Sequence, residues 1–465
     1  MDRNLSASAV SERLGAFAAA LRWEDIPSDV RTRSRHLILD AVGCALAARR
    51  FGFSSTALRG ISDLAGEGDS VVIGQKLRLP LRDAVLANGI LAHGLDYDDT
   101  HSEGIVHLTV SVFPTVLALA AHENLHLRDL LVAYILGIEA GARLGAVAKG
   151  AFHQVGFHPT GVIGAFACAL AAGKLYGLDA AQLAQAQGVA LSVASGSLEF
   201  LEDGAWTKRL HPGWAGVGGI VAAALARRAF KAPRAAYEGR FGLYASYLGA
   251  RAAEGDLSRA TARLGEVWET MNVALKPFPA CHFAHAFADA AIALHNQIPD
   301  FRQIDRITAL VPAEIVQTVC EPAAAKRRPV SDYDAKFSLP YIIAASLLRG
   351  HFGLVELEDS SLKDFRILDI ASKVDYAIDP SSTFPRHYGG EVVVHTRDGR
   401  ELRQREAVNR GSADRPLSNA DIVDKFMSNA GYGASPQEAL QVSKAILGMD
   451  ESTPARALAD ALGER

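Results

Sequence analysis

The chain has 465 residues, of which 49% are hydrophobic and 22% are charged, and its formal net charge is −4. This balance is typical of a globular protein with several domains, and the lack of a basic surplus disfavours nucleic-acid binding. The four cysteines lie far apart without a CxxC pair, which excludes a disulfide scaffold and a cysteine-only metal site of usual spacing. We therefore expect buried, reduced thiols in a cytoplasmic protein.

Two uncharged segments, 107–122 and 150–173, are long enough to be considered as membrane spans. Pro114 lies inside the first segment, and the second contains His153 and His158. Because a bilayer interior penalises such groups, we expect both segments to be buried in a helical core, without membrane association. The first residues also lack a basic stretch followed by an apolar one, so no secretory signal is expected.

Residues 1–272 carry apolar side chains at helical spacing and are predicted to be mostly helical. Helices are expected over 30–48, 130–148, 161–176 and 180–194. Ser28 is predicted to cap the first of these, whereas Gly177 and Asp179 mark the end of one helix and the start of the next. Several of these segments are apolar on all sides, which is typical of the central helices of a thick bundle.

The region between the first helices contains a predicted surface loop over 59–70 and two short strand-like pieces at 71–73 and 77–79. Residues 273–410 differ in character. β-Branched residues are enriched over 304–311 and 390–395, and proline breaks are frequent.

The dipeptide Asp398-Gly399 lies between two strand-like segments and predicts a tight hairpin. Residues 273–410 are therefore predicted to form an α+β domain. From Pro416 onward helices return: Ser418 is expected to cap a helix over 419–428, and Ser435 with the proline after it is expected to open another.

The first polar cluster is the stretch HGLDYDDTH at 93–101, followed by His107. If this stretch is helical, His93, Asp96 and Thr100 lie on one face. A carboxylate beside histidines can tune a general base or bind a cation. Two alternatives are a solvated helix end and the acid motif of terpene cyclases, whose carbocation pockets need more aromatic side chains than the 7% present.

The second cluster places His158 in GFHPTG, directly before an apolar helix that Thr160 can cap. A helix N-terminus favours an anion, so His158 is suited to move a proton at a bound anion. A structural histidine in a turn is the alternative. The third cluster, TKRLH at 207–211, brings Lys208 and Arg209 together, which can bind carboxylates. A solvated run of charges is the alternative.

The fourth cluster, KPFPACHFAH at 276–285, lies where the helical region meets the α+β region. His282 and His285 could be metal ligands, but no third ligand at a usual spacing accompanies them, so a histidine pair packed at a domain junction is the stronger alternative. A Walker loop and a GxSxG motif are absent, and the glycines at 216–219 follow no predicted strand. Together the clusters favour proton transfer on a small anionic substrate without a cofactor.

These clusters also carry a resemblance to the MmgE/PrpD family, which includes 2-methylcitrate dehydratase, cis-aconitate decarboxylase and iminodisuccinate epimerase. The matching stretches are LDAVGCALA (39–47), ANGILAHGLDYDDTH (87–101), GFHPTGVIGAF (156–166), GAWTKRLHPGWA (204–215), YEGRFGLY (237–244), KPFPACHFAH (276–285) and GSADRPLSNADIVDKF (411–426). The resemblance implies a mainly α protein. It further implies that a large all-helical domain, 1–272, is completed by C-terminal helices at 411–465, and that residues 273–410 form a smaller α+β lid domain.

The family resemblance also implies a homodimer that works without a metal or another cofactor. It carries over an acidic–Thr–His motif onto Asp96, Thr100 and His107, with His101 as a competitor for the last position. The other positions that the resemblance assigns to the site are His158, Thr207, Lys208, Lys276, Cys281, His282, His285 and Tyr333.

From these residues we expect a cytoplasmic lyase that abstracts a proton alpha to a carboxylate of a small di- or tricarboxylate. His158 is the expected base, Asp96 is expected to orient a neighbouring histidine, and His107 or His285 is expected to protonate a departing hydroxyl. The cations expected to bind substrate carboxylates are Lys208, Lys276 and Arg209.

The favoured activity is a 2-methylcitrate dehydratase-like reaction. The alternatives are a cis-aconitate decarboxylase-like or iminodisuccinate epimerase-like reaction, a non-enzymatic helical scaffold, and a metal-dependent or cyclase-like enzyme that uses Asp96, Asp98 and Asp99.

Overall fold

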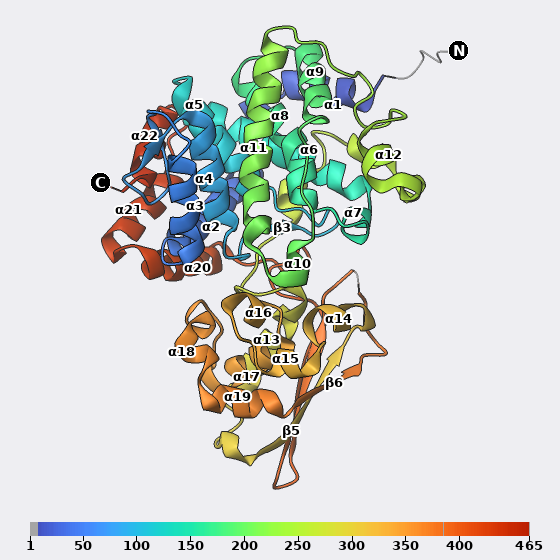
Figure 1. The fold of residues 1–465 in the computed structure, drawn as a ribbon, viewed down its shortest axis with the longest axis vertical. Coiled ribbons are helices and arrows are strands. Elements are labelled where there is room, and N and C mark those ends of the chain that lie inside the picture. The colour runs from blue at the N-terminus through green and yellow to red at the C-terminus, as the bar shows by residue number, and fades with distance from the viewer. Residues whose placement is uncertain (1–7, 385, 465) are drawn as a thin grey trace. The chain divides into compact units, whose positions relative to one another are not determined.

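The computed structural model describes residues 8–384 and 386–464, which form mainly helices with a few small sheets. They divide into two compact units (Figure 1). A helical unit contains the described residues up to Ala274 and those from Ser418 onward, and an α+β unit contains Leu275–Leu417. Each unit is described by itself below.

The helical unit consists of helices joined by short connections and two small strand pairs. Its helices are α1 (Val10–Ala20), α2 (Ser28–Ala48), α3 (Gly52–Ser62), α4 (Leu81–His93), α5 (Thr109–His122), α6 (Leu127–Val147), α7 (Ala151–Gln154), α8 (Pro159–Leu175), α9 (Ala180–Ala190), α10 (Phe200–Asp203), α11 (His211–Arg227), α12 (Leu243–Leu248), α20 (Asn419–Gly433), α21 (Pro436–Leu447) and α22 (Ala455–Leu462). The antiparallel strand pairs are β1 (Ser70–Val71) with β2 (Arg78–Leu79), and β3 (Thr100–His101) with β4 (Val273–Ala274).

The core of the helical unit is formed by helices that are apolar on nearly every side. In α5, α6 and α8 almost every residue is buried, which confirms the prediction for the two uncharged segments. Among the described residues, α6 is the one helix that is long and apolar enough to cross a membrane, and its apolar window is wholly buried inside the structure. Its apolarity therefore matches the position of a core helix.

Small residues allow α11 to approach both α4 and α8, which it contacts along its length (Figure 1). A Cβ atom on Gly89 of α4 would lie 2.4 Å from the Cα of Gly213 in α11. A Cβ on Gly219 would lie 2.4 Å from the Cβ of Cys168 in α8. No larger side chain fits at these crossings, so glycine there fixes how closely the three helices pack.

The C-terminal helices pack within the helical unit, where α20 lies against α2. Buried Lys425 of α20 lies 2.7 Å from the carboxylate of Asp40 in α2 and donates a 2.7 Å hydrogen bond to the carbonyl of Tyr97. Its ammonium also lies 3.9 Å from the centre of the Tyr97 ring. One cation thus joins α20 to α2 and to the loop after α4.

The α+β unit contains a four-stranded sheet in the order β6-β5-β7-β8. Its strands are β5 (Ile304–Val311), β6 (Val374–Ile378), β7 (Gly390–Thr396) and β8 (Glu401–Glu406), and its helices are α13 (His285–His295), α14 (Val316–Val319), α15 (Ala323–Arg327), α16 (Asp332–Lys336), α17 (Leu339–Arg349), α18 (Asp359–Leu362) and α19 (Phe365–Ser372). Strand β5 pairs parallel with β6 and antiparallel with β7, and α13 packs on β7 and β8. The β7–β8 hairpin turns at Asp398-Gly399 as predicted, with Gly399 at φ +84°.

Several predicted helix ends are confirmed, and others are wrong. Asp179, Ser418 and Ser435 cap α9, α20 and α21 through side-chain hydrogen bonds. Ser28 and Thr160 do not cap, because α2 and α8 already begin at Ser28 and Pro159. In both cases a proline with its fixed φ angle starts or precedes the helix, which moves the boundary.

Two further expectations about local structure need correction. The helix α4 ends at His93, so the stretch 93–101 is not one helical face. The predicted loop over 59–70 begins only after α3 ends at Ser62. As expected, the segment that contains Pro114 is buried in a helix, α5, where packing outweighs the hydrogen bond that the proline removes.

Candidate functional site

The helical unit brings a group of histidines, acids and one lysine together from segments far apart in the chain. The segments that contribute are the end of α4, the loop to β3, the start of α5, the start of α8, the 3-10 helix η2 (Trp206–Leu210) and the start of α11. The group consists of His93, Asp96, Asp98, Thr100, His107, His153, His158, Lys208 and His211, which are joined by the contacts described next.

Asp98 is the carboxylate that bonds to two of these histidines. The Nδ1 of His93 lies 2.9 and 3.0 Å from its two oxygens, and the Nδ1 of His107 lies 3.2 Å from one of them. The Nδ1 of His107 also donates to the carbonyl of Asp99 at 2.6 Å, which requires that this nitrogen carries the proton. Asp98 therefore orients both rings through their Nδ1 sides and leaves their Nε2 atoms facing elsewhere.

The ring of His158 stacks on that of His93 and is tilted against that of His107. The ring centres of His93 and His107 are 4.8 Å apart, and that of His158 lies 5.7 Å from His93 and 6.0 Å from His107. His158 precedes α8, where its backbone amide donates to the carbonyl of Gly196. Its Nδ1 lies 2.9 Å from Nδ1 of His211, so one of the two nitrogens donates to the other.

Thr160 positions His107 relative to His158. Its hydroxyl accepts a 3.1 Å hydrogen bond from the backbone amide of His107, which ties the start of α5 to the start of α8. On the other side, the Thr100 hydroxyl lies 3.2 Å from the Nδ1 of His107. The ring of His107 is thereby held from two chain segments.

Burial keeps four of the imidazoles, those of His93, His153, His158 and His211, neutral at neutral pH. It lowers the pKa of His93 to about 4 against the opposing effect of Asp98, and it lowers the pKa of His211 and of His153 to about 4. Burial, with the charge of Lys208 as the next cause, holds the pKa of His158 well below its usual value. These rings therefore enter a reaction as proton acceptors.

The acidic residues of the loop behave in opposite ways. Burial alone would raise the pKa of Asp98, but His93 and His107 outweigh it and hold that pKa well below its usual value. Burial raises the pKa of Asp99 to about 8, although the hydroxyl of Thr109 bonds to its carboxyl group. At neutral pH Asp98 is therefore ionised and Asp99 is protonated.

Lys208 faces the same group and is paired with Asp96. Its Nζ lies 2.7 Å from Oδ2 of Asp96, and 13% of the lysine side chain is exposed. Asp96 adopts φ +53°, in the left-handed region that non-glycine residues seldom occupy. This backbone conformation turns the loop. As a result the Asp96 carboxylate pairs with a cation, whereas the Asp98 carboxylate bonds to two imidazoles.

Two other predicted candidates have contacts of their own. The Nε of Arg209 donates to the carbonyl of Gly94 at 2.8 Å, and its guanidinium lies 4.1 Å from the centre of the Phe53 ring. His101 lies 3.2 Å from Glu269 through Nε2. Of the two histidines that competed for one position, His107 is the one beside His158.

Of the remaining predicted residues, Thr207 lies in η2 of the helical unit, and the others belong to the α+β unit. They are Lys276, Cys281, His282, His285 and Tyr333.

All but Tyr333 are buried, and the rings of His282 and His285 lie 4.8 Å apart. Asn409 donates from its Nδ2 to the Nε2 of His282 at 3.0 Å, and the Nε2 of His285 donates to the carbonyl of Ala280 at 3.1 Å. The structure thus brings the two histidines of this motif together.

Four residues of the helical group were not among the predicted site residues. They are His93, Asp98, His153 and His211. The first two were visible in the HGLDYDDTH stretch, where several acids competed for one role. His211 lies two residues after Arg209 in the TKRLH cluster, which is the signal that could have included it.

Among residues 8–384 and 386–464, the side chains that converge as a metal site are histidines. The ligand atoms of His93, His107 and His158 all lie within 4.8 Å of one another. Asp96, Asp98 and Asp99 instead bond to Lys208, to histidines and to Thr109, which argues against the cyclase-like alternative.

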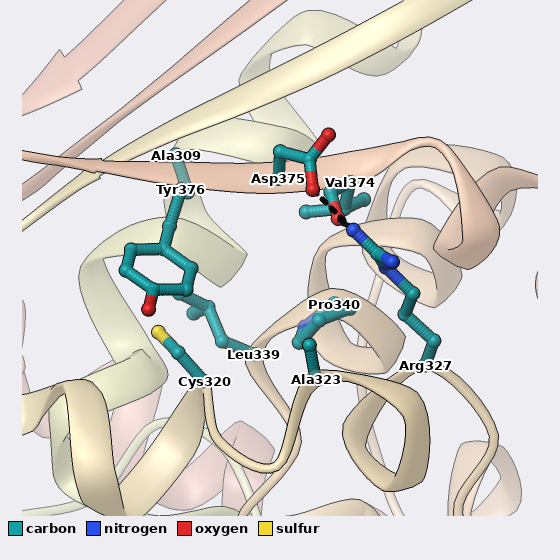
Figure 2. Close-up of a pocket in the computed structure, with 9 residues that line it drawn as sticks. All are labelled: Ala309, Cys320, Ala323, Arg327, Leu339, Pro340, Val374, Asp375 and Tyr376. Atoms are coloured by element: carbon teal, nitrogen blue, oxygen red, sulfur yellow. Dashed lines mark hydrogen bonds and ion pairs between the residues drawn. The ribbon is translucent and has the colours of Figure 1, made fainter.

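A separate pocket in the α+β unit lies between β5, β6 and the helices α15 and α17 (Figure 2). Cys320 and Tyr376 point toward one another across it, and Arg327 pairs with Asp375 at its edge. Burial raises the pKa of the Cys320 thiol to about 12, so this thiol is not a nucleophile at neutral pH. The pocket therefore lacks the proton-transfer groups that gather in the helical unit.

Comparison with known proteins identifies the family of the chain. The sequence model of the MmgE/PrpD N-terminal domain matches residues 12–256, and that of the MmgE/PrpD C-terminal domain matches residues 278–449. The chain belongs to the MmgE/PrpD family, and it is a lyase.

Curated relatives match over nearly the whole chain. The cis-aconitate decarboxylase-like protein oryM of Aspergillus oryzae is 26% identical over 461 residues, covering 95% of this chain and 95% of the relative. Cis-aconitate decarboxylase of Aspergillus terreus is 26% identical over 465 residues, covering 96% and 94%. The human cis-aconitate decarboxylase is 29% identical over 438 residues, covering 90% and 88%.

Proposed function

We propose that this lyase decarboxylates cis-aconitate, or a closely related small tricarboxylate, without a cofactor. The observation that carries the proposal is the buried group of neutral imidazoles beside the ammonium of Lys208. The names of the relatives, which span almost the entire chain, indicate the substrate. They favour decarboxylation over the dehydration that we expected from the sequence.

The proposed reaction needs a carboxylate anchor and a proton donor. When the bond to the departing carboxylate breaks, its electron pair forms a new carbon–carbon double bond, and CO₂ leaves. The far carbon of the original double bond takes up one proton, so the trianion and one proton give a five-carbon dicarboxylate and CO₂. The negative charge that develops along the carbon chain is stabilised by a fixed cation nearby.

Lys208 supplies that cation in the proposal. Its ammonium is paired with Asp96 in the structure, so a substrate carboxylate joins or replaces Asp96 as its partner. His158 moves the proton: a bound trianion raises the proton affinity of this buried ring, which then protonates the substrate carbon. His107, held by Asp98 and Thr100, is proposed to assist in the transfer.

A second candidate function, dehydration of a 2-methylcitrate-like substrate, is favoured by one observation. The lowered pKa values of His93 and His158 make these rings proton acceptors at neutral pH, and dehydration begins with abstraction of a proton alpha to a carboxylate. The same residues would then catalyse dehydration, in which hydroxide leaves instead of CO₂. Epimerisation uses the same first step and returns the proton to the opposite face.

We also propose that Lys276 and His285 of the α+β unit take part in substrate binding or proton transfer, with Arg209, Cys281, His282 and Tyr333 as further contacts. Single substitutions test each of them. A binding residue raises KM with little change in kcat, and a proton-transfer residue lowers kcat.

The function is tested by proton NMR in D₂O with purified protein and excess EDTA. The substrates are cis-aconitate, 2-methylcitrate, citrate and an imino-dicarboxylate, each with His158→Gln as the control for contaminating activity. Decarboxylation of cis-aconitate gives new olefinic signals of a five-carbon product, whose protonated carbon carries deuterium. Dehydration of methylcitrate without decarboxylation supports the second candidate, and exchange at Cα with an unchanged skeleton supports epimerisation. If every substrate is unchanged by folded wild-type protein, the proposal is contradicted.

A further inference from the structure

The histidines at the centre of the helical group form a three-sided set of nitrogen ligands. The ligand atoms of His93, His107 and His158 lie within 4.8 Å of one another, and all three side chains are buried. They come from the end of α4, the residues before α5 and the residue before α8. The three histidines are therefore held in place by three different helices of the helical unit.

Hydrogen bonds fix which nitrogen each ring presents. Nδ1 of His107 donates to a carbonyl oxygen, and Nδ1 of His93 donates to the carboxylate of Asp98, so Nε2 carries the lone pair in both rings. His158 presents a lone pair at Nε2 when its Nδ1–H donates to His211. The tautomers of the first two rings are thus already those of metal ligands.

The Nε2 of His93 is a buried acceptor without a hydrogen-bond partner in the described structure. Leaving such a group unsatisfied is unfavourable, because it loses its hydration without gaining a partner. A ligand that accepts its lone pair, such as a metal ion, removes this cost. This buried nitrogen therefore points to a ligand, independently of the closeness of the three rings.

The surroundings suit a divalent cation. A ligand histidine whose other nitrogen donates to a carboxylate is the usual outer arrangement of a zinc site, and Asp98 supplies it for His93 and His107. The groups whose charges act on His93 are Asp98, His107 and Lys208, and the ammonium of Lys208 is balanced by Asp96. The negative charge of Asp98 is therefore left to favour a cation.

We propose that His93, His107 and His158 bind a divalent transition-metal ion, with Zn²⁺ as the reference ion, through their Nε2 atoms. Zinc–nitrogen bonds of about 2.1 Å in tetrahedral geometry require the nitrogens to be about 3.4 Å apart. The ligand nitrogens of the three rings lie within 4.8 Å of one another, so the rings must draw together to bind one ion. A water or a substrate oxygen takes the fourth position.

The bound metal inhibits the enzyme, a consequence that rests on the proposed function. Coordination occupies the nitrogen with which His158 moves a proton, and it holds His107 in place. The metal is thus a regulator that competes with catalysis, so the reaction itself still runs without a cofactor.

The binding test uses full-length protein freed of metal with EDTA and then desalted. Co²⁺ is added as a spectroscopic probe and Zn²⁺ as a competitor, and heat of binding is measured in parallel. We expect one Co²⁺ per chain with the visible absorption of a tetrahedral site, which Zn²⁺ displaces. His93→Gln should weaken binding at least tenfold, and Asp98→Asn, which keeps all three ligands, by roughly 10–100-fold.

Exposed His122, at the end of α5, provides the matched control. His122→Gln should bind Co²⁺ as the wild type does. Absence of saturable Co²⁺ or Zn²⁺ binding by folded wild-type protein overturns the proposal, as does equal binding by the His93→Gln and His122→Gln variants when circular dichroism shows both folded.

The activity arm is separate from the binding arm. Zn²⁺ should inhibit turnover over the same concentration range as it binds, and EDTA should restore it. Binding without inhibition overturns the regulatory part. If no substrate is turned over, the proposed function fails, while the Co²⁺ spectrum still decides the metal site.

Discussion

Two histidine pairs, one in each unit, share their ring geometry and differ in what they bond to. The centres of His93 and His107 are 4.8 Å apart with planes inclined by 52°, and the same two values describe His282 and His285. The first pair shares the buried carboxylate of Asp98. The second bonds to the amide of Asn409 and to a backbone carbonyl.

The difference shows that the partner, more than the ring contact, determines what a histidine pair can do. An ionised carboxylate fixes the tautomer and strengthens the opposite nitrogen as a base or ligand. A neutral amide or carbonyl orients a ring without adding charge. On this comparison we propose that the pair in the helical unit takes part in proton transfer and that the pair in the α+β unit holds a substrate group.

The largest expected effect comes from His158, the ring that stacks on His93 of the first pair. His158→Gln should lower kcat by roughly 10²–10⁴, because a positioned proton carrier contributes about that much. Initial rates on the substrate identified by NMR provide the measurement, with His122→Gln as the surface control. Near-normal kcat in folded His158→Gln protein would remove this residue from the mechanism.

The next effect tests the comparison itself. Asp98→Asn should lower activity by roughly 10–100-fold, because it removes the charge behind His93 and His107 while keeping the shape. Asn409→Ala removes a neutral partner of His282 and should cost about 0.5–1.5 kcal/mol, a loss of roughly two- to twelvefold. A larger loss from Asn409→Ala than from Asp98→Asn, in kcat/KM of folded proteins, would reverse the assignment of the two pairs.

Comparison of these residues with the sequence shows what local patterns can and cannot supply. The cap at Asp179 and the hairpin at Asp398-Gly399 depend on neighbours in the chain, so they were predictable. Individual polar residues of the site, such as His107 and Lys208, were found because their residue types stood out in apolar surroundings.

Contacts between distant segments were not predictable. The choice of Asp98 over Asp96 as the partner of the histidines depends on a left-handed residue in the loop. The pairing of His158 with His211 depends on how α8 and α11 cross, which the sequence alone does not specify.

A smaller effect, on stability, concerns the packing of α4, the helix that ends at His93, against α11. Gly89→Ala places a Cβ 2.4 Å from the backbone of Gly213, so it should destabilise the protein by about 1–3 kcal/mol, measured by denaturant unfolding. Gly60→Ala in α3 is the matched control, because no atom lies within 4 Å of its new Cβ. The control should be neutral or more stable by up to about 1 kcal/mol, owing to the better helix propensity of alanine. Equal stability of the two variants would contradict the close crossing.

The smallest expected effect is in the pH dependence of kcat/KM, which reports ionisations of the free enzyme. An imidazole with a pKa of 6.5 would be only about 10% neutral at pH 5.5. Because burial lowers the pKa of His93 to about 4 and that of His158 well below its usual value, both stay neutral there. After correction for substrate ionisation, kcat/KM should change less than about twofold between pH 7 and 5.5 if the neutral ring accepts a proton, as in dehydration or epimerisation. In the proposed decarboxylation, where the ring must first gain the proton that it donates, kcat/KM should rise over this range. A tenfold fall would show that the rings titrate like exposed histidines.

The central claim is that Asp98 holds His93 as a neutral ring with its proton on Nδ1. Two-bond proton–nitrogen NMR on protein with ¹⁵N-labelled histidine tests it at pH 7, with the His93 signals assigned by their loss in His93→Gln. The account predicts the neutral Nδ1–H pattern in the wild type and its change in Asp98→Asn. An imidazolium pattern, or a neutral ring protonated on Nε2, in the wild type would contradict it.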